Sequence, residues 1–234
     1  MVKGHGRYEY RAITGRPDYD WPNGTRLAVY IGLNLEHFAF GEGLGAELAT
    51  GGPPPDILNY AWRDYGNRVG AWRMLELFEL LDLPVSVLAN SAMYDYAPEL
   101  MASFRKRGDE IVGHGRTNSE RQSVLDAAEE AALIEEATLV LHSAEGVPPR
   151  GWLSPWIAES VDTPDLLTAA GYRYTLNWCM DDQPIWMNTR NGPLLSIPYP
   201  QEANDIPSIV ARKDGASQFA DIIKALRPAH DRLH

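Results

Sequence analysis

Two short segments carry the side chains best suited to chemistry, and each follows an apolar run. Glu36 and His37 come shortly after the run 27–33, and His114 comes directly after the run 110–113. Short apolar runs of this kind are typical of buried strands. In α/β proteins the carboxyl ends of parallel strands gather their loops into one crevice. We therefore expect Glu36, His37 and His114 to converge on one cavity of about 300 to 1,000 Å³, the usual size of a ligand pocket.

Strand-like and helix-like segments alternate along the whole chain, which predicts a mainly parallel sheet wrapped by helices. The apolar runs predict strands over 27–33, 85–89, 110–113, 151–153, 172–176 and 194–197. Apolar residues at helical spacing predict helices over 67–82, 98–106, 124–142 and 164–170. A chain of 234 residues with 44% hydrophobic content can bury one sizeable core. We expect an N-terminal arm over 1–24 and one domain over 25–234.

The composition excludes several classes of partner. A net charge of −11 argues against nucleic acid and anionic lipid, because both select a basic surface. A single cysteine, Cys179, excludes an intramolecular disulfide and a zinc site of several cysteines, and it fits a reducing compartment. No run reaches the length of a membrane span, and the polar start lacks the apolar core of a signal peptide. We expect a cytoplasmic protein that acts on a small molecule.

Several motifs, in a specific order, carry a resemblance to a known family. They lie at 19–24, 34–37, 113–118, 150–152, 181–184 and 198–205. With these motifs the chain resembles the polysaccharide deacetylase family, also called carbohydrate esterase family 4. It is most similar to the branch of allantoinase-type and cyclic-imide-type amide hydrolases. The resemblance implies an α/β fold, a distorted seven-stranded (β/α) barrel with its motifs at the carboxyl ends of the strands.

The resemblance also implies a metal centre, and one position departs from it. In the family a divalent metal, usually zinc, is held by an acid and two histidines beside a general base. Glu36 takes the base position, His37 the neighbouring ligand position and His114 that of the first histidine. Asn118 stands where the second histidine belongs, and an amide is a weaker ligand than imidazole. Two interpretations stay open, a zinc site with Asn118 in the third position and a site without metal. Arg150 takes the position of an arginine that orients the base.

A second departure concerns the C-terminal part of the chain. The family carries a late Leu-x-His motif on its last strand, where the histidine protonates the leaving group. Here His230 and His234 follow the helix-like segment 218–226, and no strand precedes them. The sequence therefore predicts a barrel that lacks its last strand, by truncation or divergence, with the general acid missing or supplied from elsewhere. Because an open strand edge invites association, we expect a homo-oligomer.

Four residues are candidates for substrate binding, namely Trp152, Trp156, Asp182 and Trp186. The tryptophans could wall the substrate site or simply belong to the core, and the aspartate could simply be solvated. His37 could cap a strand end and Asn118 a helix, so these two residues also have a purely structural interpretation.

The chemistry that follows is hydrolysis of a carbon–nitrogen bond other than a peptide bond. A carboxylate, alone or with a metal, removes a proton from water as the water attacks an amide-type carbonyl. The resemblance favours a small cyclic amide, imide or ureide as substrate. The alternatives are an N-deacetylase of an acetylated amino-sugar polysaccharide and a binding homologue with impaired catalysis.

Overall fold

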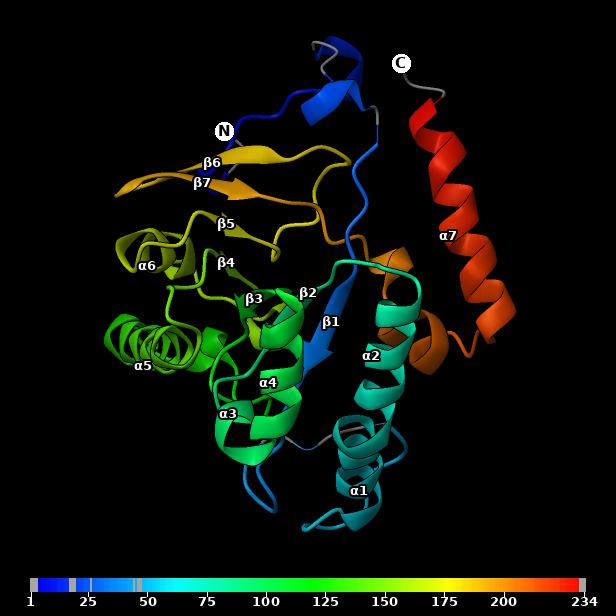
Figure 1. Ribbon diagram of the computed structural model, residues 1–234. Helices are drawn as coiled ribbons and strands as arrows, with labels where there is room; N and C mark the ends of the chain where they lie inside the picture. The colour runs from blue at the N-terminus through cyan, green and yellow to red at the C-terminus, as the bar shows by residue number, and fades with distance from the viewer. Residues whose placement is uncertain (1–3, 17–19, 26, 44, 46–47, 232–234) are drawn as a thin grey trace.

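The computed structural model describes residues 4–16, 20–25, 27–43, 45 and 48–231, and its centre is one sheet of seven strands (Figure 1). The strands are β1 (Gly32–Leu35), β2 (Ser86–Ala89), β3 (Glu110–Gly113), β4 (Gly151–Trp152), β5 (Tyr174–Thr175), β6 (Ile185–Thr189) and β7 (Gly192–Ser196). Their order is β1-β2-β3-β4-β5-β7-β6, and every neighbouring pair is parallel except the antiparallel hairpin of β6 and β7. This mostly parallel sheet confirms the predicted α/β class and is consistent with a distorted barrel of the deacetylase type.

Helices follow most of the strands in sequence. The α-helices are α1 (Ile57–Tyr65), α2 (Ala71–Leu80), α3 (Met93–Tyr96), α4 (Pro98–Arg107), α5 (Ala127–Glu145), α6 (Thr163–Ala169) and α7 (Ala216–Asp231). Short helical turns are η1 (Ile13–Gly15), η2 (Pro22–Gly24), η3 (Gly66–Gly70), η4 (Gln122–Val124), η5 (Pro155–Ile157), η6 (Gln201–Ala203) and η7 (Ile206–Ala211). Of these, η3 joins α1 to α2 without a break. Helices cover the strands from outside, with α2 and α4 near β1 and β2 and with α5 and α6 near β4 and β5 (Figure 1).

The alternation of side chains along the strands divides the core into separate clusters. On β2, Val87 and Ala89 pack with the residues of α2 and α4, including Phe78 and Phe104. Leu88, between them in sequence, instead packs in a cluster with Val112 of β3 and with Leu153 and Leu176, which directly follow β4 and β5. Successive side chains of a strand point to opposite faces, so one face of the sheet meets the helices and the other encloses an interior. That interior opens at the carboxyl ends of the strands.

The limits of the helices follow from local sequence signals. α5 begins at a capping box in which the Asp126 carboxylate accepts from the Glu129 backbone while the Glu129 carboxylate accepts from the Asp126 backbone. α4 starts at Pro98 and is capped after Arg107 by Gly108, whose φ of +81° is the left-handed conformation that glycine adopts without strain. These signals explain why the predicted helices 98–106 and 124–142 lie close to α4 and α5.

The clearest differences between the predicted and the observed elements are at β1, α1 and β6. The predicted strand 27–33 is shifted, because β1 begins only at Gly32, and Val29 before it is 78% exposed. The apolar run therefore begins several residues before the segment that pairs with β2. The prediction omitted α1, since the five residues before Asp56 are rich in glycine and proline. It also omitted β6, which lies at the edge of the sheet and alternates exposed with buried residues.

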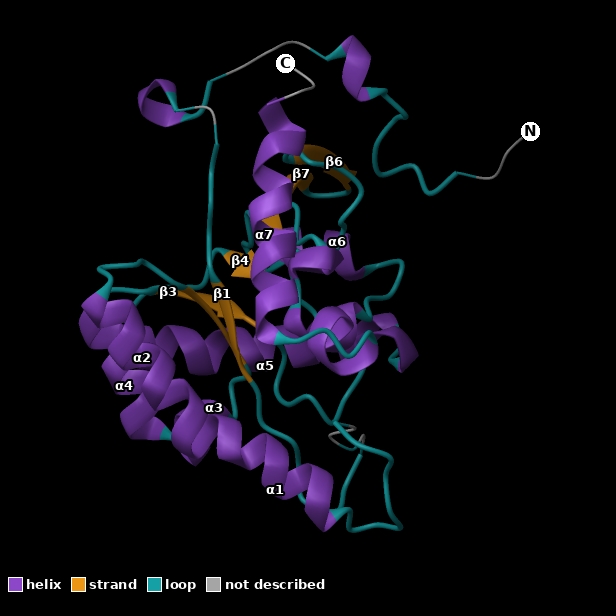
Figure 2. Ribbon diagram, turned by 90° about the vertical axis from the view of Figure 1, so that its right-hand side faces the viewer, coloured by secondary structure: helices purple, strands orange, loops and turns teal. Residues whose placement is uncertain are grey.

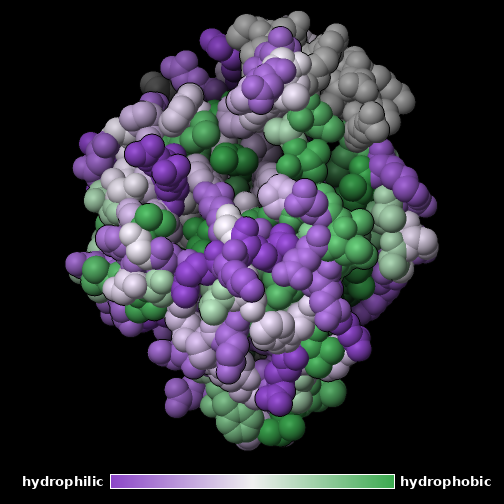
Figure 3. All heavy atoms as spheres, in the orientation of Figure 1, coloured by the Kyte–Doolittle hydropathy of each residue, from purple (hydrophilic) through white to green (hydrophobic). Residues whose placement is uncertain are grey.

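The two edge strands leave the sheet open in the described part of the chain. β1 pairs only with β2, and β6 only with β7. The last described element is a helix, α7, which packs on η6 and η7 and lies apart from the sheet (Figures 1 and 2). Among the described residues no helix is long and apolar enough to cross a membrane. Hydrophilic side chains gather near the centre of the face in Figure 3, with hydrophobic ones exposed beside them.

The first described part of the N-terminal arm runs beside β6 (Figure 1). Arg7 donates from its guanidinium to both carboxylate oxygens of Asp165, at 3.0 and 2.9 Å, and its carbonyl accepts from the Asn188 backbone. Such a bidentate pair is stronger and more directional than a single contact. The arm is thus fixed to the domain at Arg7.

Candidate active site

The centre of the candidate site is a close pair, the carboxylate of Glu36 and the imidazole of His114. Glu36 follows the last residue of β1, and His114 follows the last residue of β3, while β2 lies between the two strands. The Glu36 Oε1 atom is 3.5 Å from the His114 Nε2 atom. The two motifs therefore meet at the carboxyl edge of the sheet, 78 residues apart in the chain.

A hydrogen bond to the backbone fixes the orientation of His114. Its Nδ1 atom lies 2.6 Å from the Leu153 carbonyl oxygen, which can only accept, so Nδ1 carries the proton. Nε2 then faces the cavity, and no described atom forms a hydrogen bond with it although it is buried. Gly113 permits this close approach, because a Cβ atom there would lie 2.6 Å from the Trp152 ring. His114 thus presents one nitrogen toward Glu36 and the cavity.

Arg63 of α1 holds the other side of the Glu36 carboxylate. Its guanidinium donates to Oε2 at 3.1 Å and stacks over the Phe38 ring at 4.9 Å. Burial alone would raise the pKa of Glu36. The contact with His114 and the positive charge of Arg63 outweigh burial, so the pKa lies below its usual value. Glu36 is therefore ionised at neutral pH, as a base that accepts a proton from water must be.

Asn90 joins the segments that carry these groups. Its Nδ2 atom donates to the His114 carbonyl and, at 3.1 Å, to Asn118 Oδ1, and its Oδ1 atom accepts from the His37 backbone at 2.8 Å. The Asn118 backbone in turn donates to the His37 carbonyl at 2.8 Å. Asn90 follows β2, the central strand of the three, and was not among the predicted site residues. The sequence feature that could have pointed to Asn90 is its position as a polar residue directly after the apolar run 85–89.

His37 is not brought to Glu36 and His114. Its ring packs against Tyr96 of α3, with 4.7 Å between the ring centroids, and burial lowers the pKa of its imidazole. The reason lies in the alternation along an extended chain. Asn34 and Glu36 face the interior, whereas Leu35 belongs to the cluster under the helices and His37 follows it to that side. The expectation of three converging groups is therefore corrected to two.

The cavity at Glu36 and His114 has a volume of about 170 Å³, which is smaller than expected from the sequence. It is lined by Asn34, Glu36, Arg63, His114, Asn118, Leu153, Ser154, Trp156, Ile157, Tyr199, Gln201, Asn204, Ile206 and Pro207. Asn34, Glu36 and His114 come from the ends of β1 and β3, Arg63 comes from α1, and most of the other lining residues come from the segments after β4 and β7. A concave cavity in which polar side chains converge beside apolar ones is the usual form of a site for a small molecule.

The remaining predicted residues lie at different distances from this cavity. Trp156 lines it and donates from its indole nitrogen to the Asn118 carbonyl. Trp152 is fully buried in the cluster under α5 and α6. Arg150 is exposed just before β4, at the end of the strand opposite to the cavity, and Trp186 on β6 is 62% exposed. The contact expected of Arg150 with the base is made in the structure by Arg63.

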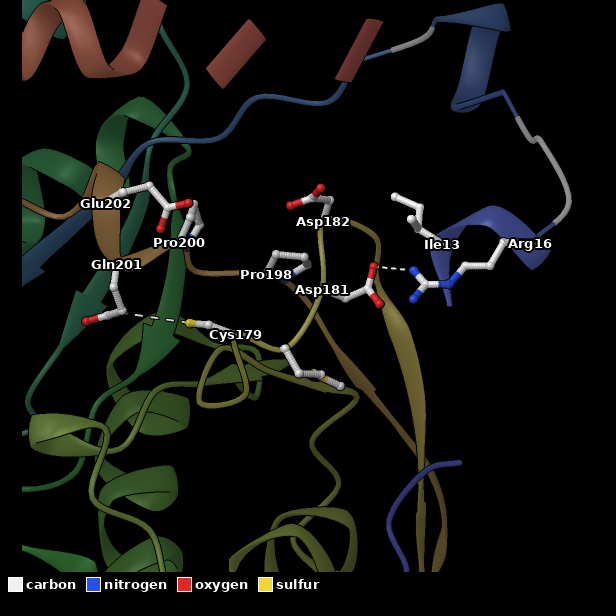
Figure 4. Close-up of a pocket in the computed structure, with 10 residues that line it drawn as sticks. Ile13, Arg16, Cys179, Asp181, Asp182, Pro198, Pro200, Gln201 and Glu202 are labelled. Carbon is white, nitrogen blue, oxygen red and sulfur yellow. Dashed lines mark hydrogen bonds and ion pairs between the residues drawn. The ribbon is translucent and has the colours of Figure 1, made fainter. Parts of the chain in front are cut away.

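Asp182 lines a second, larger cavity of about 460 Å³ (Figure 4). In this cavity Asp181 pairs with Arg16 of the arm, and Cys179 lies near the Gln201 amide. Gln201 lines both cavities, so the two adjoin at this residue. Asp182 is therefore near the candidate site without lining the cavity of Glu36.

The donors present do not fit the expected zinc site. A catalytic zinc takes three protein ligands and keeps one position open. Glu36 and His114 supply two, His37 faces the helices, and the Asn118 oxygen accepts a hydrogen bond from Asn90. Within the described residues no group of three His, Cys, Asp or Glu side chains is placed to hold a metal. The geometry instead provides a carboxylate held by an arginine.

A second carboxyl group, Glu159, titrates near neutral pH. Burial raises its pKa to about 7, although Asn177 and Trp178 donate hydrogen bonds to it, and the nearby charge of Glu130 raises it further. The folded protein therefore holds this proton more tightly than the unfolded chain. The stability that the proton contributes is complete below the unfolded pKa of about 4.3 and is lost as the pH rises toward the folded value.

We expect the melting temperature of the wild type to fall more steeply between about pH 5 and 8 than that of Glu159→Gln. The substitution removes this titration, so the difference between the two curves isolates the contribution of Glu159. Glu135→Gln, on the exposed side of α5, serves as the control and should keep the wild-type slope. Parallel curves for the wild type and Glu159→Gln would contradict the raised pKa.

Comparison with known proteins identifies the fold. No family model matches the chain. A solved structure titled Puue Allantoinase superposes with a TM-score of 0.81 at 25% identity, covering 95% of this chain and 80% of that one. The chain has the polysaccharide deacetylase fold. A probable polysaccharide deacetylase from Pseudomonas aeruginosa PAO1 superposes with a TM-score of 0.80 at 26% identity, and the match again covers 95% of this chain and 80% of that one.

A sequence comparison agrees with this fold. A Schizosaccharomyces pombe protein described as a putative polysaccharide deacetylase is 24% identical over 97% of this chain and 80% of its own length. The resemblance to the polysaccharide deacetylase family that the motifs indicated is thereby confirmed, and it includes an allantoinase.

Proposed function

We propose that this chain hydrolyses a carbon–nitrogen bond in a small cyclic amide, imide or ureide. The observation that carries the proposal is the cavity of about 170 Å³ at Glu36 and His114. It is smaller than the roughly 300 Å³ at which ordinary ligand pockets begin, so it suits a single small ring. The names of the relatives, an allantoinase and polysaccharide deacetylases, are consistent with hydrolysis of an amide-type bond.

Glu36 acts as the base. A water between Glu36 Oε1 and His114 Nε2 can donate one hydrogen to each, and its oxygen then attacks the carbonyl carbon of the substrate. The proton that the water loses passes to Glu36. When the carbon–nitrogen bond breaks, Glu36 returns this proton to the departing nitrogen, which gives a ring-opened product with a new carboxyl group. One carboxyl group thus serves both proton transfers, and no separate acid is required.

His114 positions the attacking water and Arg63 positions the base, and neither takes up the proton. The hydrogen bond from Nδ1 to the Leu153 carbonyl keeps Nε2 unprotonated in the neutral ring and therefore able to accept from the water. Arg63 leaves Oε1 as the atom that faces His114, because it occupies Oε2. A zinc ion, expected from the resemblance, would have to be held by Glu36 and His114 together with a third ligand that these two residues do not supply.

The proposal is tested with a panel of purified substrates: succinimide, allantoin and an N-acetylated chito-oligosaccharide. Each is assayed with and without a chelator. We expect turnover of at least one cyclic substrate, no deacetylation of the chito-oligosaccharide, and rates that the chelator leaves unchanged. Release of acetate from the oligosaccharide would instead support the N-deacetylase. Loss of activity after chelation, restored by zinc, would show that a metal is needed after all.

The matched control is Glu36→Gln protein purified in the same way, because any turnover that it shows would come from a contaminating hydrolase. Absence of turnover throughout, with a cyclic substrate still bound, would favour the binding homologue over the enzyme.

A further inference from the structure

Asn34 presents an unpaired acceptor in the candidate cavity. Asn34 and Glu36 lie two residues apart on β1 and its continuation, so both face the interior. The Asn34 Oδ1 atom is buried, and no described residue donates a hydrogen bond to it. Leaving a buried acceptor unpaired is costly, which indicates that a ligand supplies the donor.

Tyr199 presents an unpaired donor beside it. Its hydroxyl oxygen accepts from Asn34 Nδ2 at 3.4 Å, and no described residue accepts the hydrogen that the hydroxyl carries. Tyr199 lies in the loop after β7 and lines the same cavity. Burial raises the pKa of the phenol, so the hydroxyl keeps its hydrogen at neutral pH. Asn34 and Tyr199 therefore offer one acceptor and one donor side by side.

We infer that Asn34 and Tyr199 bind the N–H and C=O groups of a cis amide, and thereby select ring-shaped substrates with a free N–H. In a small ring the amide is forced to be cis, so its N–H and C=O groups lie on the same edge. An acyclic secondary amide such as an N-acetyl group is trans, with these groups on opposite sides. This inference rests on the proposed function and assigns its recognition to two residues.

The size of the preference follows from the amide bond itself. Bringing an acyclic amide into the cis form disfavours it by roughly a hundredfold or more. Tyr199 also lies where it can stabilise the carbonyl oxygen as negative charge develops on it during attack by water. Removing one such donor commonly lowers kcat by about 10² to 10³.

The test uses succinimide and N-methylsuccinimide, which share a ring and differ only at the N–H group. Binding is measured by NMR titration to the Glu36→Gln protein, so that no hydrolysis is needed. We expect succinimide to bind at least about tenfold more tightly. When Asn34→Leu is introduced into the Glu36→Gln protein, the affinities for the two imides should become similar, because only succinimide loses a contact. Adding Tyr199→Phe should weaken both to a similar degree, because both retain the carbonyl group.

Tyr10→Phe provides the matched control, since Tyr10 is 92% exposed and lines neither cavity. Equal binding of the two imides to the parent protein, a ratio unchanged by Asn34→Leu, or failure of succinimide to bind would each overturn the inference. These results are separate from the turnover panel. Discrimination by binding without any turnover would contradict the proposed hydrolysis and leave the recognition by Asn34 and Tyr199 in place.

Discussion

Glu36→Gln is expected to lower kcat by at least about 10² to 10⁴, the contribution of a positioned general base. The glutamine side chain has nearly the same shape and can still accept from Arg63 through its oxygen, but it cannot take a proton from water. Because Glu36 also carries the proton to the departing nitrogen in the proposed mechanism, the loss should lie toward the upper end. Steady-state kinetics on the cyclic substrate identified by the panel measure this effect.

The control for this change is Glu135→Gln, which alters the same chemical group on the exposed side of α5. Its kcat should equal that of the wild type. Both variants should keep the wild-type circular dichroism, which separates lost chemistry from lost folding. If Glu36→Gln retained a kcat within about tenfold of the wild type, Glu36 would not be the base.

Trp152→Ala is expected to lower the free energy of unfolding by about 3 to 5 kcal/mol, the usual effect of removing a large buried aromatic ring. Trp152 is fully buried, stacks edge-on against Tyr172, and donates from its indole nitrogen to Gln122 and Ser154. The substitution leaves a cavity in the core, and the acceptors on Gln122 and Ser154 lose their donor. Urea denaturation followed by circular dichroism measures the difference.

Trp186→Ala is the matched control, because Trp186 is 62% exposed on the edge strand β6. Substitution there should change the free energy of unfolding by no more than about 0.5 kcal/mol. The comparison also tests the two tryptophans as substrate-binding residues. A normal stability of Trp152→Ala together with a raised KM would show that the ring belongs to the substrate site rather than to the core.

The sequence predicted the parts of this molecule that depend on local pattern. Apolar runs and helical spacing gave the α/β class, and the position of polar residues after those runs brought Glu36 and His114 to one edge. The direction of His37 was available from the same alternation, since neighbouring residues of an extended segment face opposite sides. The prediction for His37 was wrong because Glu36 and His37 are adjacent and face opposite sides.

The contacts between distant segments could not be predicted in this way. Arg63 reaches Glu36 from a helix that follows a stretch of glycine and proline, and nothing in that helix distinguishes it from a solvated arginine. Tyr199 and Asn34 are 165 residues apart in the chain. Their meeting depends on the path of the loop after β7. Such a path is set by the packing of the whole domain rather than by the residues that meet.

Asn90 has a further consequence for the energetics of the site. One amide group bonds to the backbone beside Glu36 and to the backbone at His114, so the segments after β1 and β3 cannot shift independently. The free-energy cost of ordering Glu36 and His114 is therefore met when the protein folds, which leaves little reorganisation when a substrate arrives. Asn90 therefore ties together the segments that carry Glu36 and His114, whereas the opposite wall of the cavity comes from the segments after β4 and β7.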